Sequence, residues 1–433
     1  MLFVVIASLL PMLLGYMSRD RFDRSFTTLA LLFAVAFYCL PLLAAYSTGR
    51  VVYQDHASIF PNGEVARCII GMFVFSSGFG GLCLYLKQRG IKFGVVPFQW
   101  SFRSSYGTML LQVAFAAAMI IMVVVLYRSD FYATNVAVRA KEIKINYAFA
   151  ASMMGLYFIG CYYLILALNR RSIILSAFWF VATLSLILIY GGRMQTLVVL
   201  ALPFIRFFKR LNLALITMCI VIAVLFPLII GGKVLIAAVG NHDDVVQAAI
   251  NLYRNPISNQ VILNNFAHPF VSYFYAPALV NEVGYRWFWD VPQGFLFYLR
   301  LFGINAGDSL TYLNTMLLIG VNESIIPPGY LAFGYVQANL FGVFLTGIFF
   351  RFTGSFARFI KERCLAPSAP SDFFFAFMAA NTFYIGEMRG LVLTFFAPCF
   401  LMYVIGRRRL RSFSLGTRRP FSHSPSAHRA GII

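Results

Sequence analysis

Long runs of apolar residues recur along this chain, and short segments with polar and charged residues separate them. Most of these runs reach about 20 residues, the length that crosses the hydrocarbon core of a bilayer as a helix. Apolar positions within a run are continuous instead of alternating, which favours helices over strands. Hydrocarbon offers no hydrogen bonds, so each run must satisfy its own backbone groups. The pattern predicts an all-α, polytopic transmembrane bundle of about eleven helices.

The predicted spans are separated by loops of very different lengths. They cover residues 2–17, 26–46, 65–86, 106–127, 147–168, 172–190, 194–208, 211–231, 330–350, 371–387 and 390–405. Residues 232–329 form one large loop rich in aromatic side chains, and a connection of this length usually carries function. We expect helices in it near 243–254 and 293–303, with breaks at Pro256, Pro269, Pro277 and Pro292. The chain thus divides into residues 1–231 with eight spans, the loop, residues 330–405 with three spans, and a basic tail, 406–433, expected to be disordered.

Composition agrees with a membrane environment and argues against two other classes of protein. The chain is 60% hydrophobic and 12% charged, about half the charge of a soluble domain. The formal net charge of +20 lies in short clusters between apolar runs, so a nucleic-acid-binding face is not expected. The seven cysteines show no Cys-x-x-Cys spacing and are absent from the large loop, which argues against a disulfide framework and a zinc site.

The charged residues also predict the orientation of the spans. Alternate loops and the tail hold 23 of the 35 basic residues but only four acidic ones, and positive segments stay in the cytoplasm. The amino terminus is therefore predicted to be periplasmic, the carboxyl terminus cytoplasmic, and the large loop periplasmic. The first apolar run has no basic residue before it, so we expect a retained helix instead of a signal peptide.

Two arginines stand apart from the clusters that set the orientation. Arg193 and Arg389 each lie between two apolar runs, beside glycines, at the predicted outer boundary of the membrane. Ionisable groups in such positions often mark functional sites, and the guanidinium group suits phosphate. The alternative is that each reaches into the headgroup layer or pairs with a nearby acid such as Glu387.

The large loop supplies further ionisable groups. Its cations include Arg254, Arg286 and Arg300, its carboxylates include Asp290, Asp308 and Glu323, and His268 is its candidate imidazole. Such groups can deprotonate a sugar hydroxyl or stabilise a leaving group, although each residue taken alone also fits a salt bridge or a solvated loop.

Three short motifs and their arrangement resemble one known family. These motifs are Pro327-Pro328-Gly329 before a helix that carries several glycines, Gly191-Gly192-Arg193, and Met388-Arg389-Gly390. Together with the number of spans and the large loop before the last three, they resemble the bacterial O-antigen polymerases. The resemblance implies an inner-membrane glycosyltransferase that needs no metal or other cofactor. It would transfer a growing glycan from undecaprenyl pyrophosphate onto another lipid-linked repeat unit.

The same resemblance suggests roles and partners. Arg193 and Arg389 would hold the pyrophosphate, with Arg286 and Arg300 as further candidates, and Glu323, Asp290 or His268 would position or deprotonate the acceptor. Expected partners are the undecaprenyl-pyrophosphate-linked glycan, membrane lipid, a chain-length regulator and a flippase, with no nucleic acid. An O-antigen ligase and a transporter or flippase of lipid-linked sugars are the alternatives.

We predict that a tag inserted near Gly307 is labelled by an impermeant reagent from outside the membrane, whereas a tag at Gly94 is not. The charge alternation places these residues on opposite sides. Opening the membrane should make the tag at Gly94 reactive, which is the control. Labelling of Gly94 in the sealed membrane would contradict the orientation.

Overall fold

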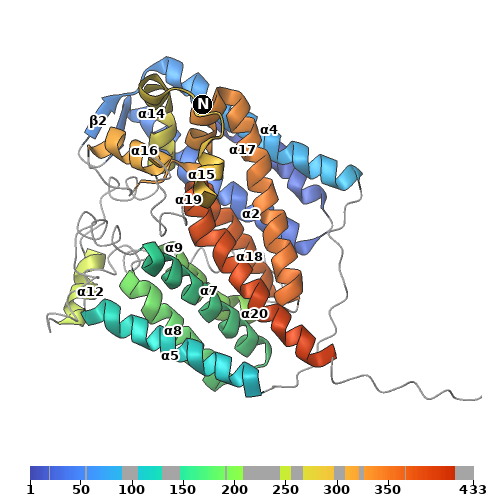
Figure 1. The fold of residues 1–433 in the computed structure, drawn as a ribbon. Helices are drawn as coiled ribbons and strands as arrows, with labels where there is room; N and C mark the ends of the chain where they lie inside the picture. Colours follow the sequence, from blue (N-terminus) through green and yellow to red (C-terminus); the bar gives the residue numbers. More distant parts are fainter. Residues whose placement is uncertain are drawn as a thin grey trace, which may run out of the picture.

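Helices dominate the computed structural model of this protein, which confirms the all-α class. It describes residues 1–18, 20–53, 56–89, 106–128, 147–190, 193–207, 244–254, 267–296, 308–320, 326–365 and 367–414. Figure 1 shows two groups of helices. One group contains α2 (Arg21–Ala34), α4 (Asn62–Gln88), α17 (Gly329–Cys364), α18 (Ala369–Asn381) and α20 (Ala397–Ser414). The second contains α5 (Tyr106–Arg128), α7 (Tyr147–Asn169), α8 (Ile173–Tyr190) and α9 (Arg193–Phe207), and it packs on α18 and α20.

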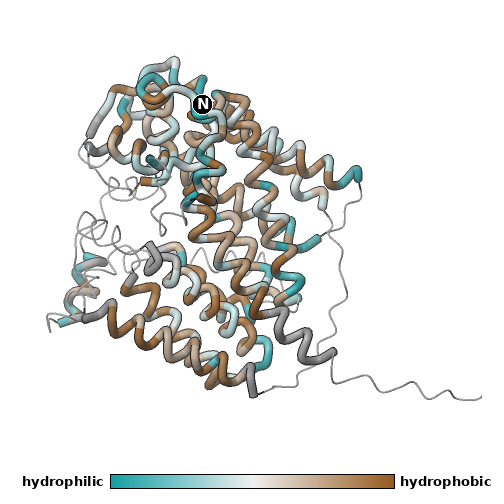
Figure 2. The backbone as a smooth tube through the Cα atoms, viewed as in Figure 1, coloured by the Kyte–Doolittle hydropathy of each residue, from teal (hydrophilic) through white to brown (hydrophobic). Residues whose placement is uncertain are grey.

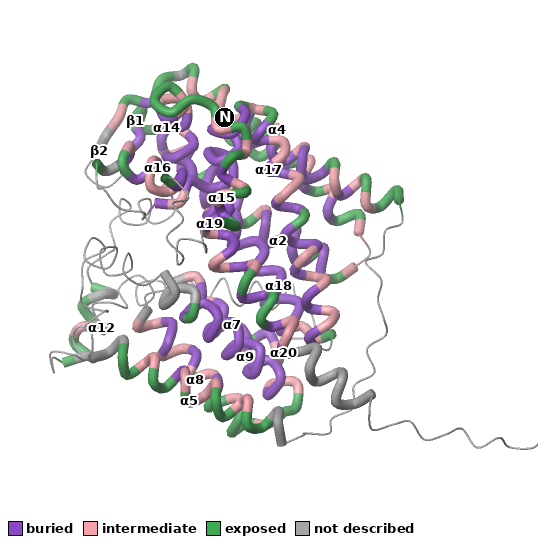
Figure 3. Tube along the Cα trace, in the orientation of Figure 1, coloured by how far each residue is buried: buried purple, intermediate pink, exposed green. Residues whose placement is uncertain are grey.

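Most predicted spans that fall in the described residues correspond to helices. Five described segments are long and apolar enough to cross a membrane: Arg21–Thr48, Gly63–Gln88, Ser152–Asn169, Gly329–Cys364 and Met388–Ile405. Apolar residues run along their lengths and along α5 and α8 in Figure 2. α5 also leaves much of its surface exposed, whereas α7 and α18 are largely buried (Figure 3). The predicted span 211–231 lies outside the described residues, and the total of about eleven spans stays a prediction.

Proline explains two departures from simple spans near the amino terminus. Residues 2–17 form two pieces, α1 (Leu2–Ala7) and the 3-10 helix η1 (Leu10–Met17), so the prediction of one continuous helix was wrong. Pro11 lies in the first turn of η1, where its missing N–H costs nothing. Further on, a π-helical turn, η2 (Val35–Cys39), joins α2 to α3 (Leu40–Thr48) just before Pro41, whose lack of an N–H disturbs the regular ladder.

The predicted span 330–350 is wrong in one important respect, because α17 reverses direction inside it. Ala338 and Asn339 have non-helical backbone angles, and Asn339 has φ of 53°, a region that asparagine tolerates better than most residues. A Cβ on Gly334 would lie 2.7 Å from the carbonyl oxygen of Gly342, so the two segments contact each other backbone to backbone. The ring of Tyr330 also lies 5.3 Å from that of Phe350. We call this unit the α17 hairpin, with a short arm, 329–337, and a long arm, 340–364.

Two glycines connect the start of the short arm to the last predicted spans. Gly329 and Gly386 both have positive φ, 72° and 67°, and a Cβ on Gly386 would overlap the backbone of Gly329 and Tyr330. The Gly329 N–H also donates to the Ile385 carbonyl oxygen at 3.3 Å. The Pro-Pro-Gly and Met-Arg-Gly motifs, far apart in sequence, therefore lie side by side in the structure. Gly386 is in the turn after η4 (Thr382–Tyr384), just before α19 (Met388–Leu391) and η5 (Val392–Phe396).

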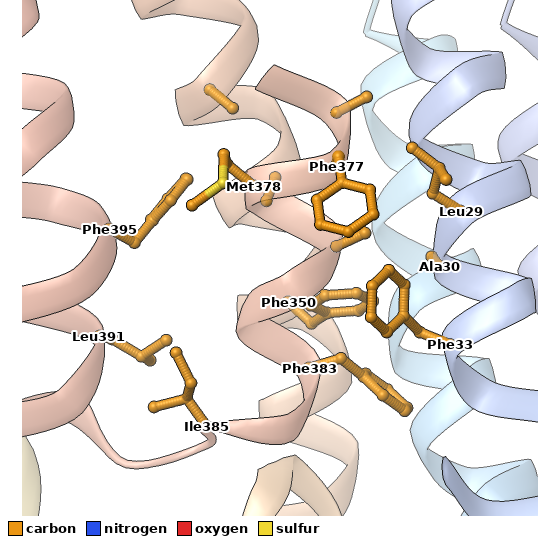
Figure 4. Close-up of a cluster of buried hydrophobic side chains, with 14 of the residues drawn as sticks. Leu29, Ala30, Phe33, Phe350, Phe377, Met378, Phe383, Ile385, Leu391 and Phe395 are labelled. Carbon is orange, nitrogen blue, oxygen red and sulfur yellow. The ribbon is translucent and has the colours of Figure 1, made fainter. Parts of the chain in front are cut away.

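Aromatic side chains fill the space where α2, α17 and α18 meet (Figure 4). Phe33 and Phe377 have ring centroids 5.5 Å apart, and Phe350 and Phe383 have centroids 5.0 Å apart. These are distances at which aromatic pairs add to the stability gained from burial alone. The pairs tie the first long helix to the carboxyl-terminal helices.

The large loop contains more regular structure than its sequence suggested. Its described helices are α12 (Val245–Arg254), α14 (His268–Val283), α15 (Asp290–Leu296) and α16 (Leu310–Ile319). The break predicted at Pro277 was wrong, because Pro277 lies inside α14, whereas Pro269 and Pro292 occupy the first turns of α14 and α15 and so lie where these helices begin. A hairpin of β1 (Arg50–Tyr53) and β2 (His56–Ile59), which was not predicted, gathers with α14, α15 and α16 at one end of the molecule (Figure 1).

The opposite end of the long arm carries a buried network of ion pairs. Asp23 of α2 pairs with Arg351 at 2.9 Å and with Arg358 at 3.2 Å, and Lys361 pairs with Asp372 at 2.8 Å. The charge alternation of the sequence predicts that these residues lie on one side of the membrane, and the structure brings their segments together. Arg351 is buried within the bundle and does not lie in a solvated loop. Which side of a membrane this end faces stays a prediction.

We predict that Gly342→Ala lowers the free energy of unfolding by about 1–3 kcal/mol, because a methyl group there would overlap the Gly334 carbonyl oxygen. The thermal midpoint of the protein in mild detergent measures the effect. Gly81→Ala is the matched control, since a Cβ at Gly81 meets nothing within 4 Å. Equal midpoints for the two variants would contradict the close packing of the hairpin.

Candidate functional site

The reversal of α17 leaves backbone carbonyl groups without helical partners, and the large loop supplies donors for two of them. The N–H of Arg286 donates to the Val336 carbonyl at 3.1 Å, and the N–H of Trp287 donates to the Gln337 carbonyl at 2.9 Å. Trp287 and Phe288 both have positive φ, 49° and 62°, which is costly for bulky residues. Such strain persists only where surrounding contacts fix the backbone, so the loop is held closely over the hairpin.

Asp290, a residue of the large loop, is held in place by the contact between this loop and the α17 hairpin. It begins α15 and is only 3% exposed. Its Oδ2 accepts from Arg286 Nε at 2.7 Å and from Gln337 Nε2 at 2.6 Å. Arg286 is held further by the Asp308 carbonyl oxygen, 3.3 Å from its Nη2. A loop carboxylate, a loop guanidinium and an amide of the short arm therefore form one bonded unit.

Glu387 and Arg389 form a second buried pair, in the turn before α19 and in its first residues. Both are buried; burial raises the pKa of Glu387 above its usual value, and the bonds from Thr311 and the positive charge of Arg389 oppose part of that shift. Glu387 Oε2 accepts from the backbone N–H of Thr311, on α16, at 3.1 Å and also from its hydroxyl.

The two pairs belong to one site, which we call the four-residue cluster: Arg286, Asp290, Glu387 and Arg389. The charge of Asp290 also raises the pKa of Glu387, so the two carboxylates interact. α15 packs directly on α19, since a Cβ on Gly294 would lie 2.9 Å from the backbone nitrogen of Arg389. Two acidic and two basic residues thus lie at the junction of the hairpin, the large loop and the last helices.

One polar atom of this junction lacks a partner in the described part of the chain. Gln337 is fully buried, and while its Nε2 donates to Asp290, its Oε1 accepts no hydrogen bond from the described residues. Buried acceptors are normally satisfied, so this oxygen is a point at which a bound hydroxyl or water would be stabilised.

The structure brings together some of the predicted site residues and separates others. Asp290, Arg286 and Arg389 share the four-residue cluster. His268 instead packs with the rings of Phe37 and Tyr384, at centroid distances of 6.3 and 5.7 Å. Arg300, Glu323 and the side chain of Arg193 lie outside the described residues, although the backbone of Arg193 begins α9.

The place of two residues in this site, Glu387 and Gln337, was not predicted from the sequence. Glu387 was considered only as a partner for Arg389, a pairing that their electrostatic interaction supports. Gln337 was overlooked, although it is a polar residue inside a predicted apolar span, the kind of position that calls for a buried partner.

Comparison with known proteins finds no matching family model, no matching curated protein and no matching solved structure. The resemblance to O-antigen polymerases therefore stays a prediction. The described residues contain no group of three or more His, Cys, Asp or Glu side chains arranged to hold a metal ion. What the apolar helices do support is the class of the protein, a helical membrane protein with a buried polar site at one end.

We predict that Asp290→Ala lowers the free energy of unfolding by about 3 kcal/mol, because it leaves the partly buried Arg286 without its counter-charge. The double variant Arg286→Ala/Asp290→Ala should recover part of that loss, since no unpaired charge remains. Thermal unfolding in detergent measures both. Asp308→Ala, at an exposed side chain, is the control and should change stability by less than about 0.5 kcal/mol. A double variant that is no more stable than Asp290→Ala would contradict the pairing.

Proposed function

We propose that this protein is a glycosyltransferase of the bacterial inner membrane that joins lipid-linked oligosaccharide repeat units at the periplasmic face, as an O-antigen polymerase does. The observation that carries the proposal is the four-residue cluster. It combines two cations suited to a pyrophosphate with two carboxylates suited to a sugar hydroxyl, next to an unsatisfied acceptor on Gln337.

The proposed reaction needs charge of both signs. The acceptor hydroxyl attacks the anomeric carbon of the donor sugar, the bond from that carbon to the pyrophosphate oxygen breaks, and undecaprenyl pyrophosphate leaves with the bonding electrons. Arg389 and Arg286 would stabilise the negative charge that develops on the pyrophosphate. The hydroxyl proton would pass to Glu387, since burial raises the pKa of this carboxylate above its usual value and so makes it a stronger base. Asp290 and Gln337 would orient the acceptor.

Aromatic side chains beside the cluster suit a glycan that arrives from the aqueous side. Tyr285, Trp287 and Trp289 flank Arg286 in sequence, and the two tryptophans are 74% and 63% exposed. Exposed indole rings offer apolar faces for sugar rings and also anchor proteins at the membrane interface. Both roles agree with a lipid-linked glycan whose pyrophosphate is held at the membrane boundary.

We predict that Arg389→Ala and Arg286→Ala each reduce long-chain glycan by about 100-fold or more when they replace the natural protein in cells. Glu387→Gln should have a similar effect, because the amide cannot accept the proton. Gel analysis of lipopolysaccharide or capsule measures chain length, and immunoblots of membranes measure insertion. Arg254→Ala, an exposed loop arginine, is the control. Arg193→Ala tests the remaining predicted pyrophosphate ligand.

The phenotype of a deletion strain separates the proposal from its alternatives. A lost polymerase leaves lipid A with a single repeat unit, whereas a lost ligase leaves none. A lost flippase leaves lipid-linked repeat units on the cytoplasmic leaflet. Full-length glycan from correctly inserted Arg389→Ala and Arg286→Ala proteins would overturn the site. Arg389→Lys keeps the positive charge, so activity in this variant would show that the loss in Arg389→Ala came from the missing charge and not from misfolding.

A further inference from the structure

A second site lies away from the four-residue cluster, between α7, α8 and α9, which are side by side in Figure 1. It is a cavity of about 770 Å³, within the range typical of small-molecule and lipid sites. Most of its wall is apolar and includes Leu164, Leu168, Phe180, Leu200, Pro203 and Phe204. Two residues of the cavity wall are exposed: Ile173 is 84% exposed and Phe204 is 46% exposed. The cavity therefore opens on the outer surface of the helix group.

Only one end of this cavity is positively charged. Arg171 and Arg206 line it together with the hydroxyl-bearing residues Ser172 and Ser176. Arg206 donates a hydrogen bond from its Nε to the Leu168 carbonyl at 3.1 Å, and its terminal nitrogens have no hydrogen-bond partner among the described residues. Neither arginine forms an ion pair with a carboxylate in the described residues.

The backbone at this end is also suited to an anion. α8 begins at Ile173, and the first N–H groups of a helix have no intrahelical partners and carry partial positive charge. α7 ends in a turn in which Ser172 N–H donates to the Ala167 carbonyl at 3.2 Å and Arg171 N–H donates to the Leu168 carbonyl at 3.2 Å. Arg171 therefore occupies the left-handed position of this turn, with φ of 58°, where glycine is usual. An arginine in this conformation carries a backbone cost, and strain of this kind is often found where the side chain has a function.

We infer that this cavity binds a membrane phospholipid with an anionic headgroup, with the phosphate between Arg171, Arg206 and the start of α8 and an acyl chain along the apolar wall. Charge complementarity selects this occupant, because the two arginines form no ion pair with a carboxylate of the described residues and match a phosphate, and the opening faces the surface that lipid would surround. The charge alternation of the sequence predicts that this end lies at the cytoplasmic leaflet, whose anionic lipids attract basic residues. The inference does not depend on the proposed enzymatic function.

The test is direct lipid binding by the purified full-length protein in mild detergent. Native mass spectrometry would compare phosphatidylglycerol with phosphatidylcholine that carries the same acyl chains. We expect the wild type to prefer phosphatidylglycerol, Arg171→Gly and Arg206→Gln each to weaken that binding about fivefold, and the double variant to weaken it about 25-fold. Binding of phosphatidylcholine should not change. Arg171→Gly relieves the left-handed strain, so its thermal midpoint should not fall, and weaker binding cannot then be attributed to unfolding.

Arg89→Gln is the matched control, because Arg89 is an exposed arginine in another predicted cytoplasmic segment, outside the cavity. It should bind phosphatidylglycerol within twofold of the wild type. Equal binding of the two lipids by the wild type, or an equal loss in Arg89→Gln, would overturn the site. Displacement of phosphatidylglycerol by an equal concentration of a polyprenyl phosphate would assign the cavity to the lipid carrier and would also overturn the inference.

Discussion

The need to satisfy backbone hydrogen bonds in an apolar environment determines how the large loop packs on the helices of this structure. Reversal of α17 at Ala338 and Asn339 frees carbonyl groups that neither lipid nor apolar side chains can bond. The N–H groups of Arg286 and Trp287 bond two of them, which fixes the large loop against the bundle. The loop thereby places Asp290 within hydrogen-bond distance of Gln337, so the polar site depends on the reversal of α17 at this point.

Sequence predicted the features that follow from repeated apolar composition. The helices that correspond to spans 65–86 and 147–168 end within a few residues of expectation, because hydrocarbon thickness and helical rise determine such lengths. The reversal of α17 was not predictable by the same means, since both arms are apolar and the average composition of 330–350 resembles that of one span. The helix break predicted at Pro277 was also wrong, because a proline ends a helix only when no neighbouring group compensates for the lost hydrogen bond.

Part of the site was predictable and part was not, for reasons of sequence distance. Arg389 and Asp290 were identifiable because charge is rare in this chain and each lies beside apolar segments. Their mutual proximity was not, since they are separated by about a hundred residues and by the whole hairpin. Glu387 gains its importance only from burial and from contact with Thr311, and Gln337 only from its place beside the reversal. Such properties arise from packing and have no local signature.

The ion pair between Asp23 and Arg351 has a consequence for the order in which the protein assembles. The two residues are 328 positions apart, so the carboxylate leaves the ribosome tens of seconds before its counter-charge has been made. During that interval α2 can pack only with its early neighbours. Closure of the first group of helices is therefore a late event in biogenesis. In a chain truncated before α17, the buried carboxylate of Asp23 would lack the positive charge of Arg351.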